Sequence, residues 1–161
     1  MSKVILTIPV LLVSLSVTSA HAQFAQESHT VTVEVTPSIV INISRPSLEL
    51  VAAESNLGLG QQAMTAVDES TVLSWRINRR HLKITVQTDL AAPKYTLKVM
   101  AVNATAGTPA PERVLGVTPK DFILDVGKTT GTAVIRYTGT ASLQQGSGSD
   151  LHLVTFTVTQ Q

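Results

Sequence analysis

The sequence predicts one all-β domain, an antiparallel β-sandwich of immunoglobulin-like or jelly-roll type with about eight to ten strands. Three observations lead to this class. Apolar and polar residues alternate with a period of two in short segments along most of the chain, which is the pattern of half-buried strands. Val and Thr, whose branched side chains favour strands, are abundant. No helical pattern of about 10–15 residues lies between the segments, which argues against a parallel α/β sheet.

An export signal precedes this domain. Lys3 supplies a basic start, residues 4–17 form a largely apolar core, and Ala20 and Ala22 occupy the −3 and −1 positions of a cleavage site. The apolar core is shorter than the roughly 20 residues that a membrane-spanning helix needs. We therefore expect removal of residues 1–22, a domain over residues 23–161 with no membrane span, and a secreted, periplasmic or cell-surface location.

The charge and cysteine content exclude several classes of function. The chain has 12 Lys and Arg against 11 Asp and Glu, and loss of Lys3 with the signal leaves 11 of each, a net charge of zero. A nucleic-acid binder needs a basic excess, so no nucleic-acid partner is expected. The absence of Cys rules out disulfides, thiolate metal sites and cysteine nucleophiles.

The domain begins with two runs of β-branched residues, all at odd-numbered positions: Val31, Val33 and Val35, and then Ile39, Ile41 and Ile43. They predict two strands, or one long strand bent at Pro37, because proline removes a hydrogen-bond donor from the ladder. Leu48 and Leu50 would begin another short strand. Residues 51–58 would form one or two helical turns or an ordered loop.

A β-hairpin is predicted in the middle of the chain. Alternating residues at 73–77 and 82–86 flank a polar turn over residues 78–81. Trp75, the single tryptophan, lies at the centre of the first segment and is expected to anchor the core between the two sheets.

The remaining segments continue the alternation to the end of the chain. Strands are expected around residues 95–101, 114–117, 122–126, 131–143 and 154–158. Residues 103–112 read as a surface loop, and residues 144–150, rich in Gly and Ser, as a flexible connector.

The one concentrated charge feature lies on the predicted hairpin. It comprises Arg76, Arg79, Arg80, His81 and Lys83. Five basic groups on one hairpin would suit an anionic sugar, a lipid phosphate or an acidic partner surface. The alternative is a solvated hairpin whose charges discourage association between sheet edges.

No motif of catalytic, cofactor or metal chemistry is recognisable. Asp121 and Asp125 are too far apart along a strand for a glycosidase pair. His29 and His152 would approach each other if the first and last strands paired, but two histidines make a weak metal site. We therefore expect a non-enzymatic protein without catalytic residues, cofactor or metal.

The ends of the domain suggest a structural role. Residues 30–35 and 151–159 alternate as strand addition to a neighbouring sheet requires. The export signal, the Val- and Thr-rich strands and the C-terminal strand resemble those of bacterial fimbrial subunits. This resemblance implies a fimbrial-like or matrix-like assembly subunit that self-associates or adds strands between subunits. The alternative is a surface module that binds a glycan or anionic partner through the Arg79–Arg80 hairpin.

Overall fold

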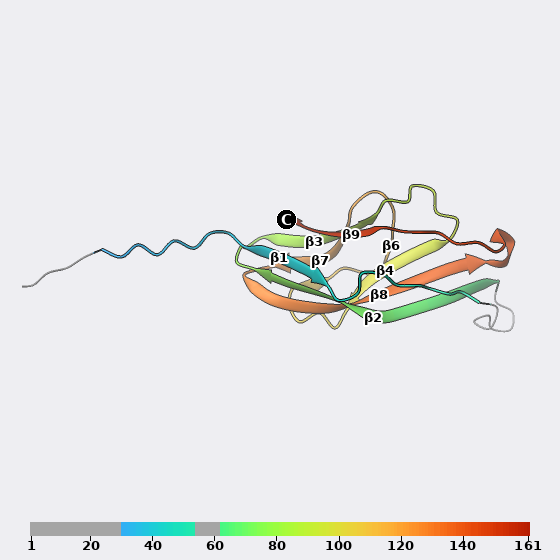
Figure 1. Ribbon diagram of the computed structural model, residues 1–161, viewed down its shortest axis with the longest axis horizontal. Helices are drawn as coiled ribbons and strands as arrows, with labels where there is room; N and C mark the ends of the chain where they lie inside the picture. Colours follow the sequence, from blue (N-terminus) through green and yellow to red (C-terminus); the bar gives the residue numbers. More distant parts are fainter. Residues whose placement is uncertain (1–29, 54–61) are drawn as a thin grey trace, which may run out of the picture. The chain divides into compact units, whose positions relative to one another are not determined.

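The computed structural model describes residues 30–53 and 62–161 (Figure 1). The chain divides into two units, Met1–Glu34 and Val35–Gln161. The predicted signal, residues 1–22, lies outside the described residues. Residues 30–34, the described part of the first unit, are exposed and have no regular secondary structure.

The second unit is an all-β sandwich of two antiparallel sheets, as predicted. Its five-stranded sheet has the order β1-β2-β8-β4-β6, with bounds Ile39–Ile43, Ala63–Ile77, Thr129–Ser142, Thr96–Val102 and Arg113–Val114. Its four-stranded sheet has the order β5-β7-β3-β9, with bounds Thr108–Pro109, Lys120–Val126, Leu82–Thr88 and Val154–Gln160. Within the described ranges the single helical element is a 3₁₀ turn, Leu143–Gln145.

The strand order favours the immunoglobulin-like alternative over the jelly roll. An immunoglobulin domain has strands A, B, E and D in one sheet and pairs C with F in the other. Here β1, β2, β8 and β4 follow the A-B-E-D order, and β3 pairs with β9 as C pairs with F. Strand G of that fold would lie beside F, and β9 is an edge strand of its sheet.

Several predicted elements differ in the structure. The loop predicted over residues 103–112 contains β5, and the strand predicted at 114–117 is only the two-residue β6. Residues 31–35 are not in a strand, and the ladder begins only at Ile39, where β1 pairs with β2. Leu48 and Leu50 form no strand, although both are half-buried and pack against the core. Residues 51–53 have no regular structure, and the rest of the expected 51–58 element lies outside the described residues.

The predicted hairpin is wrong in its pairing, although both strands exist. β2 and β3 follow each other in the sequence but belong to different sheets, so residues 78–81 cross from one sheet to the other. β2 pairs with β1 and β8 instead, and it is much longer than predicted because it starts at Ala63. Figure 1 shows β2 and β8 running side by side along the sandwich. The alternation within each strand was read correctly, but it carries no information about the partner strand.

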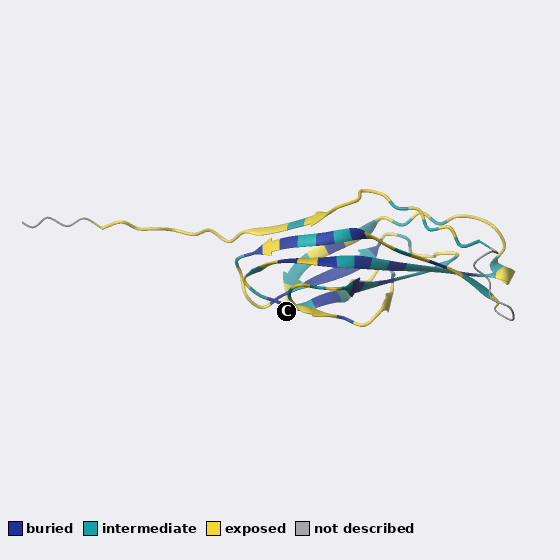
Figure 2. Ribbon diagram, turned by 90° about the horizontal axis from the view of Figure 1, so that it is seen from below, coloured by how far each residue is buried: buried dark blue, intermediate teal, exposed yellow. Residues whose placement is uncertain are grey.

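The core lies between the sheets and is formed by the alternate residues of each strand that face inward (Figure 2). Trp75 is 2% exposed, which confirms its predicted place in the core. Phe122 on β7 and Phe156 on β9 meet edge to face, with ring centroids 5.0 Å apart. The apolar faces predicted from the alternation therefore point inward from both sheets.

Candidate functional site

The cationic residues singled out in the sequence do not form one surface. Because β2 and β3 lie in different sheets, Arg76 and Lys83 are on separate sheets rather than on one hairpin. Lys83 is also paired with Asp121, its Nζ lying 2.8 Å from the carboxylate oxygen. Arg79, Arg80 and His81 remain together in the crossing loop between the sheets, and all three are exposed.

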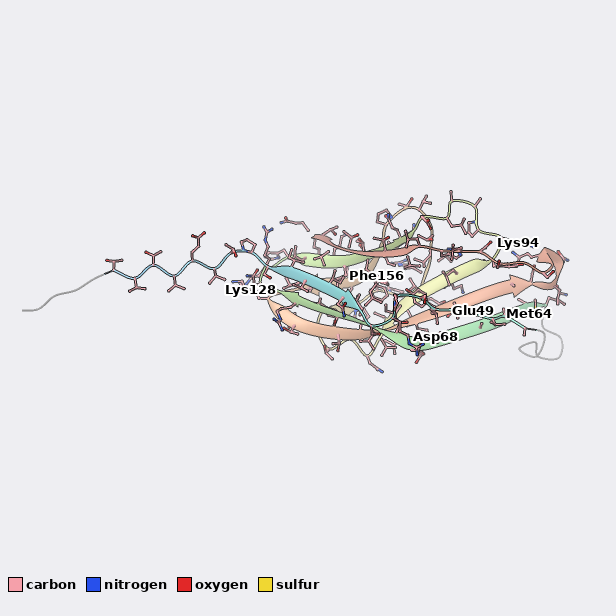
Figure 3. The ribbon with its side chains drawn as sticks, in the orientation of Figure 1. Glu49, Met64, Asp68, Lys94, Lys128 and Phe156 are labelled. Atoms are coloured by element: carbon pink, nitrogen blue, oxygen red, sulfur yellow. The ribbon has the colours of Figure 1, made fainter. Side chains whose placement is uncertain are left out.

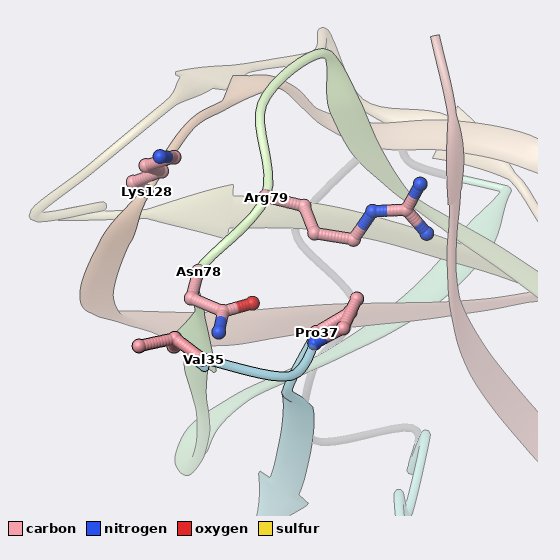
Figure 4. A pocket seen from close by; sticks show the side chains of 5 residues that line it. All are labelled: Val35, Pro37, Asn78, Arg79 and Lys128. Atoms are coloured by element: carbon pink, nitrogen blue, oxygen red, sulfur yellow. The ribbon is translucent and has the colours of Figure 1, made fainter. Parts of the chain in front are cut away.

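A hollow of about 350 Å³ lies beside this loop (Figure 4). It is lined by Val35, Pro37, Asn78, Arg79 and Lys128. Lys128 was not among the predicted site residues, because it comes from the turn between β7 and β8, far away in the sequence. Figure 4 shows the Arg79 side chain extending past Pro37, whereas Lys128 lies on the other side of Asn78. Arg79 and Lys128 thus border one hollow that is also lined by Val35 and Pro37, but their charged groups do not converge on a single point.

Arg76 borders a second, separate hollow of about 280 Å³. Its other lining residues are Val40, Asn42, Ser74, Trp75 and Thr130, from β1, β2 and β8. This lining exposes more apolar than polar surface, and Arg76 is the one charged residue in it.

The outer edge of β9 is unpaired within the described part of the chain. Gln161 N donates to His81 O, and Asp89 N donates to Leu153 O, so the odd-numbered residues of this strand bond to β3. The N–H and C=O groups of the alternate residues therefore point away from β3: those of Val154, Phe156, Val158 and Gln160. The side chains of Val154, Phe156 and Val158 also face the core, whereas Gln160 is exposed.

The outer edge of β1 has the same property. Asn78 N donates to Ser38 O and Ser44 N donates to Val72 O, so even-numbered residues bond to β2. The backbone groups of Ile39, Ile41 and Ile43 then point outward, and among described residues none of them has a hydrogen-bond partner.

β1 and β9 lie on the same lateral side of the sandwich. β4 lies against β5 and β7, so the two sheets run across the sandwich in the same order and end together at β1 and β9. We call this lateral side the open side, and define it by the inner-face residues of the two edge strands: Ile39, Ile41, Ile43, Val154, Phe156 and Val158.

Apolar side chains at the open side are incompletely covered. Ile39, Ile41 and Ile43 stand opposite the buried residues Ile77, Trp75 and Leu73 and so share their inner parity. Nevertheless Ile39 is 43% exposed and Ile43 is 37% exposed. Inner-face isoleucines with this exposure indicate that the core lacks a covering element at this edge. The sequence showed the isoleucine parity but not that the face would be left uncovered.

Contacts at both ends of β9 hold it in position. The segment before the strand is tied to β4, because Tyr95 N donates to Asp150 Oδ2 at 2.7 Å. After the strand, the Gln161 side chain both donates to and accepts from Asp125. Lys94 and Lys128 mark the two opposite ends of the sandwich in Figure 3, and Phe156 lies between them. The edge strand β9 is therefore held in place at both of its ends.

The titratable groups of the described regions form no cluster suited to a metal ion. No group of three His, Asp or Glu residues is placed to hold a metal ion there. His152 is not near another described histidine, and its Nδ1 lies 3.1 Å from the Thr88 hydroxyl. His29, the other histidine of the expected pair, lies outside the described residues, and the first described strand, β1, does not pair with β9.

Across the described residues, no helix is both long and apolar enough to cross a membrane. No family model, curated protein or solved structure matches the chain.

Proposed function

We propose that this protein is a non-enzymatic, exported structural subunit of the cell exterior, of fimbrial or matrix type, and that copies join by strand addition at the open side. The observation that carries the proposal is the pair of unpaired edges, β1 and β9, on one lateral side with exposed isoleucines between them. An added strand would bond to edge groups and cover those side chains at once.

Residues 30–35 supply a strand of matching chemistry. Val31, Val33 and Val35 alternate with polar residues and are 71%, 81% and 77% exposed. Three valines spaced by two residues match the three isoleucines of β1 and the Val154, Phe156, Val158 row of β9. Burial of one such valine stabilises by about 1.5–3 kcal/mol. A second copy is therefore the partner that this segment suits.

The location rests on the predicted export signal. Cleavage after Ala22 would leave seven residues, 23–29, ahead of residues 30–35. A net charge of zero also weakens repulsion between copies of the exported chain. Both features support assembly outside the cytoplasm.

The first experiment measures the oligomeric state of the full chain, expressed with its leader and collected from the host. Size-exclusion chromatography with multi-angle light scattering should detect assemblies that deletion of residues 23–35 abolishes. Val33→Lys should weaken assembly strongly because it places a charge on the apolar parity. Thr32→Lys, one residue away on the other face, is the matched control and should assemble normally.

A chain that stays monomeric at high concentration, with or without residues 23–35, would refute the proposal. Equal effects of the two lysine substitutions would also refute it, because strand addition requires one face of the segment to be buried.

The second candidate function is binding of a glycan or anionic partner through the crossing loop. The hollow bordered by Arg79 and Lys128 favours it, because two cations from different loops flank one surface. Replacing Arg79 and Arg80 with Glu should then abolish retention on sulfated or phosphorylated arrays. Survival of that retention would exclude the loop as the contact, and strand addition would be unaffected by this result.

A further inference from the structure

We infer that Asn78 is a positioning residue that holds the start of β1 straight, so that residues 30–35 are offered to a second copy instead of folding back onto their own open side. The inference rests on the proposed strand addition and identifies what makes that addition intermolecular. Asn78 lies at the first position after β2, where the chain begins to cross between sheets.

The Asn78 side chain bonds to the backbone on both sides of Pro37. Its Oδ1 accepts a hydrogen bond from Ser38 N at 2.7 Å, and its Nδ2 donates to Thr36 O at 2.8 Å. The Asn78 backbone N–H also donates to Ser38 O at 3.2 Å. The amide group thus takes the place of the next residue of β2 and continues the β1–β2 ladder beyond the strand's end.

Folding back is a real competitor, because the sequence has the right register for it. A turn over residues 36–38 would place Val35 opposite Ile39, Val33 opposite Ile41 and Val31 opposite Ile43. Each pair would be on the inner parity, and the isoleucine backbone groups that now point outward would find partners. A three-residue turn is a common length for a hairpin.

The Asn78 contacts oppose that turn. Reversing the chain at residues 36–38 moves Thr36 O and Ser38 N out of line with β1, so both side-chain bonds would be lost. Pro37 acts in the same direction, because the residue before a proline is restricted to extended conformations. With the direct route to its own edge disfavoured, the valine segment favours the sheet of another copy.

The test uses the absence of cysteine in the chain. Val33→Cys and Ile41→Cys are introduced together, so that a disulfide within one chain reports fold-back. The full chain is oxidised in two backgrounds, native Asn78 and Asn78→Ala. Non-reducing gels separate internal disulfides from cross-links between chains, and light scattering gives the proportion of monomer.

Asn78→Ala should raise the yield of internally cross-linked monomer by about tenfold or more, the factor expected for losing two ordinary hydrogen bonds. Asn78→Asp keeps the acceptor for Ser38 N but loses the donor to Thr36 O, so its yield should be intermediate. Asn42→Ala, an exposed asparagine on the same strand pair, is the control and should match the native background. Thermal unfolding of each variant verifies that the sandwich is intact.

Equal internal cross-linking in the Asn78, Asn78→Ala and Asn78→Asp backgrounds, with assembly retained in all of them, would overturn the role of Asn78 and leave strand addition standing. Monomers without any cross-link in every background would overturn strand addition itself, and the role of Asn78 with it.

Discussion

The indole ring of Trp75 rests on the backbone of Gly131, its register partner across the β2–β8 pair. A Cβ atom placed on Gly131 would lie 2.8 Å from Trp75 Nε1 and nearer still to two ring carbons. Real Cβ atoms essentially never approach other atoms so closely. The largest side chain of the core is therefore seated against β8 only because position 131 has no side chain.

Gly131→Ala should consequently destabilise the sandwich by about 1–3 kcal/mol, the usual range for an overpacked core. The ring would have to leave its position or the two strands would have to separate. Gly116→Ala is the matched control, since a Cβ there meets nothing within 4 Å. Urea denaturation followed by tryptophan fluorescence measures both, and an unchanged midpoint for Gly131→Ala would contradict the close packing.

The aromatic contact between β7 and the edge strand β9, which lie on either side of β3, predicts a second effect. Phe156 is 8% exposed and packs edge to face on Phe122. Phe156→Ala should cost about 3–5 kcal/mol of unfolding free energy, as large-to-small core substitutions do. The adjacent Thr157→Ala, on the exposed parity of β9, should change stability by about 0.5 kcal/mol or less. Similar losses for both variants would contradict the assigned parity of this strand.

Alkaline pH should weaken the fold through Tyr137. Burial raises the pKa of the Tyr137 phenol to about 12 from its ordinary 10.0. Because the pKa is raised in the folded state, the stabilisation is fully present below pH 10 and is lost as pH rises through about 12. Tyr137→Phe should remove this loss while leaving stability near pH 7 almost unchanged. Denaturation midpoints between pH 8 and pH 12 test it, with Thr138→Val, a half-buried position on the outer face of β8, as control. If Tyr137→Phe lost as much stability at alkaline pH as the native chain, the effect would belong to another group.

Acidic pH should lower the stability of the fold through Asp68, which lies beside the irregularity in the β2–β8 ladder. Its carboxylate accepts hydrogen bonds from the Ser70 hydroxyl at 2.7 Å and the Ser70 N–H at 2.8 Å, and these lower the pKa of Asp68 below 3.8. The stabilisation is therefore present above pH 3.8 and is lost as pH falls through the lower folded-state pKa. Asp68→Asn should differ from the native chain at pH 6 and converge with it in strong acid. A difference that stays constant with pH would show that ionisation of Asp68 is not involved.

The strands themselves were predictable because alternation is a local property. The inner parity of β2, β3, β7, β8 and β9 follows from residues two apart, and the burial of Trp75 follows from its place on that parity. The 63–70 part of β2 was missed because it interrupts the alternation and contains the ladder irregularity. The valines of residues 31–35 were predicted as a strand on the same grounds, but they form none, and no strand in the described part of the chain pairs with them.

The pairing of the strands was decided only by the tertiary structure. Residues 78–81 have the composition of a hairpin turn, yet they cross between sheets and separate Arg76 from Lys83. Lys128 and Arg79 border one hollow, and Asn78 bonds to Thr36 and Ser38. The residues in each of these contacts are far apart in the sequence, so no local pattern could predict them. The sequence by itself determined which face of each strand is apolar, because that depends on neighbours along the chain. The fold decided which edges stay unpaired and where the open side lies, because these depend on which distant strands find each other.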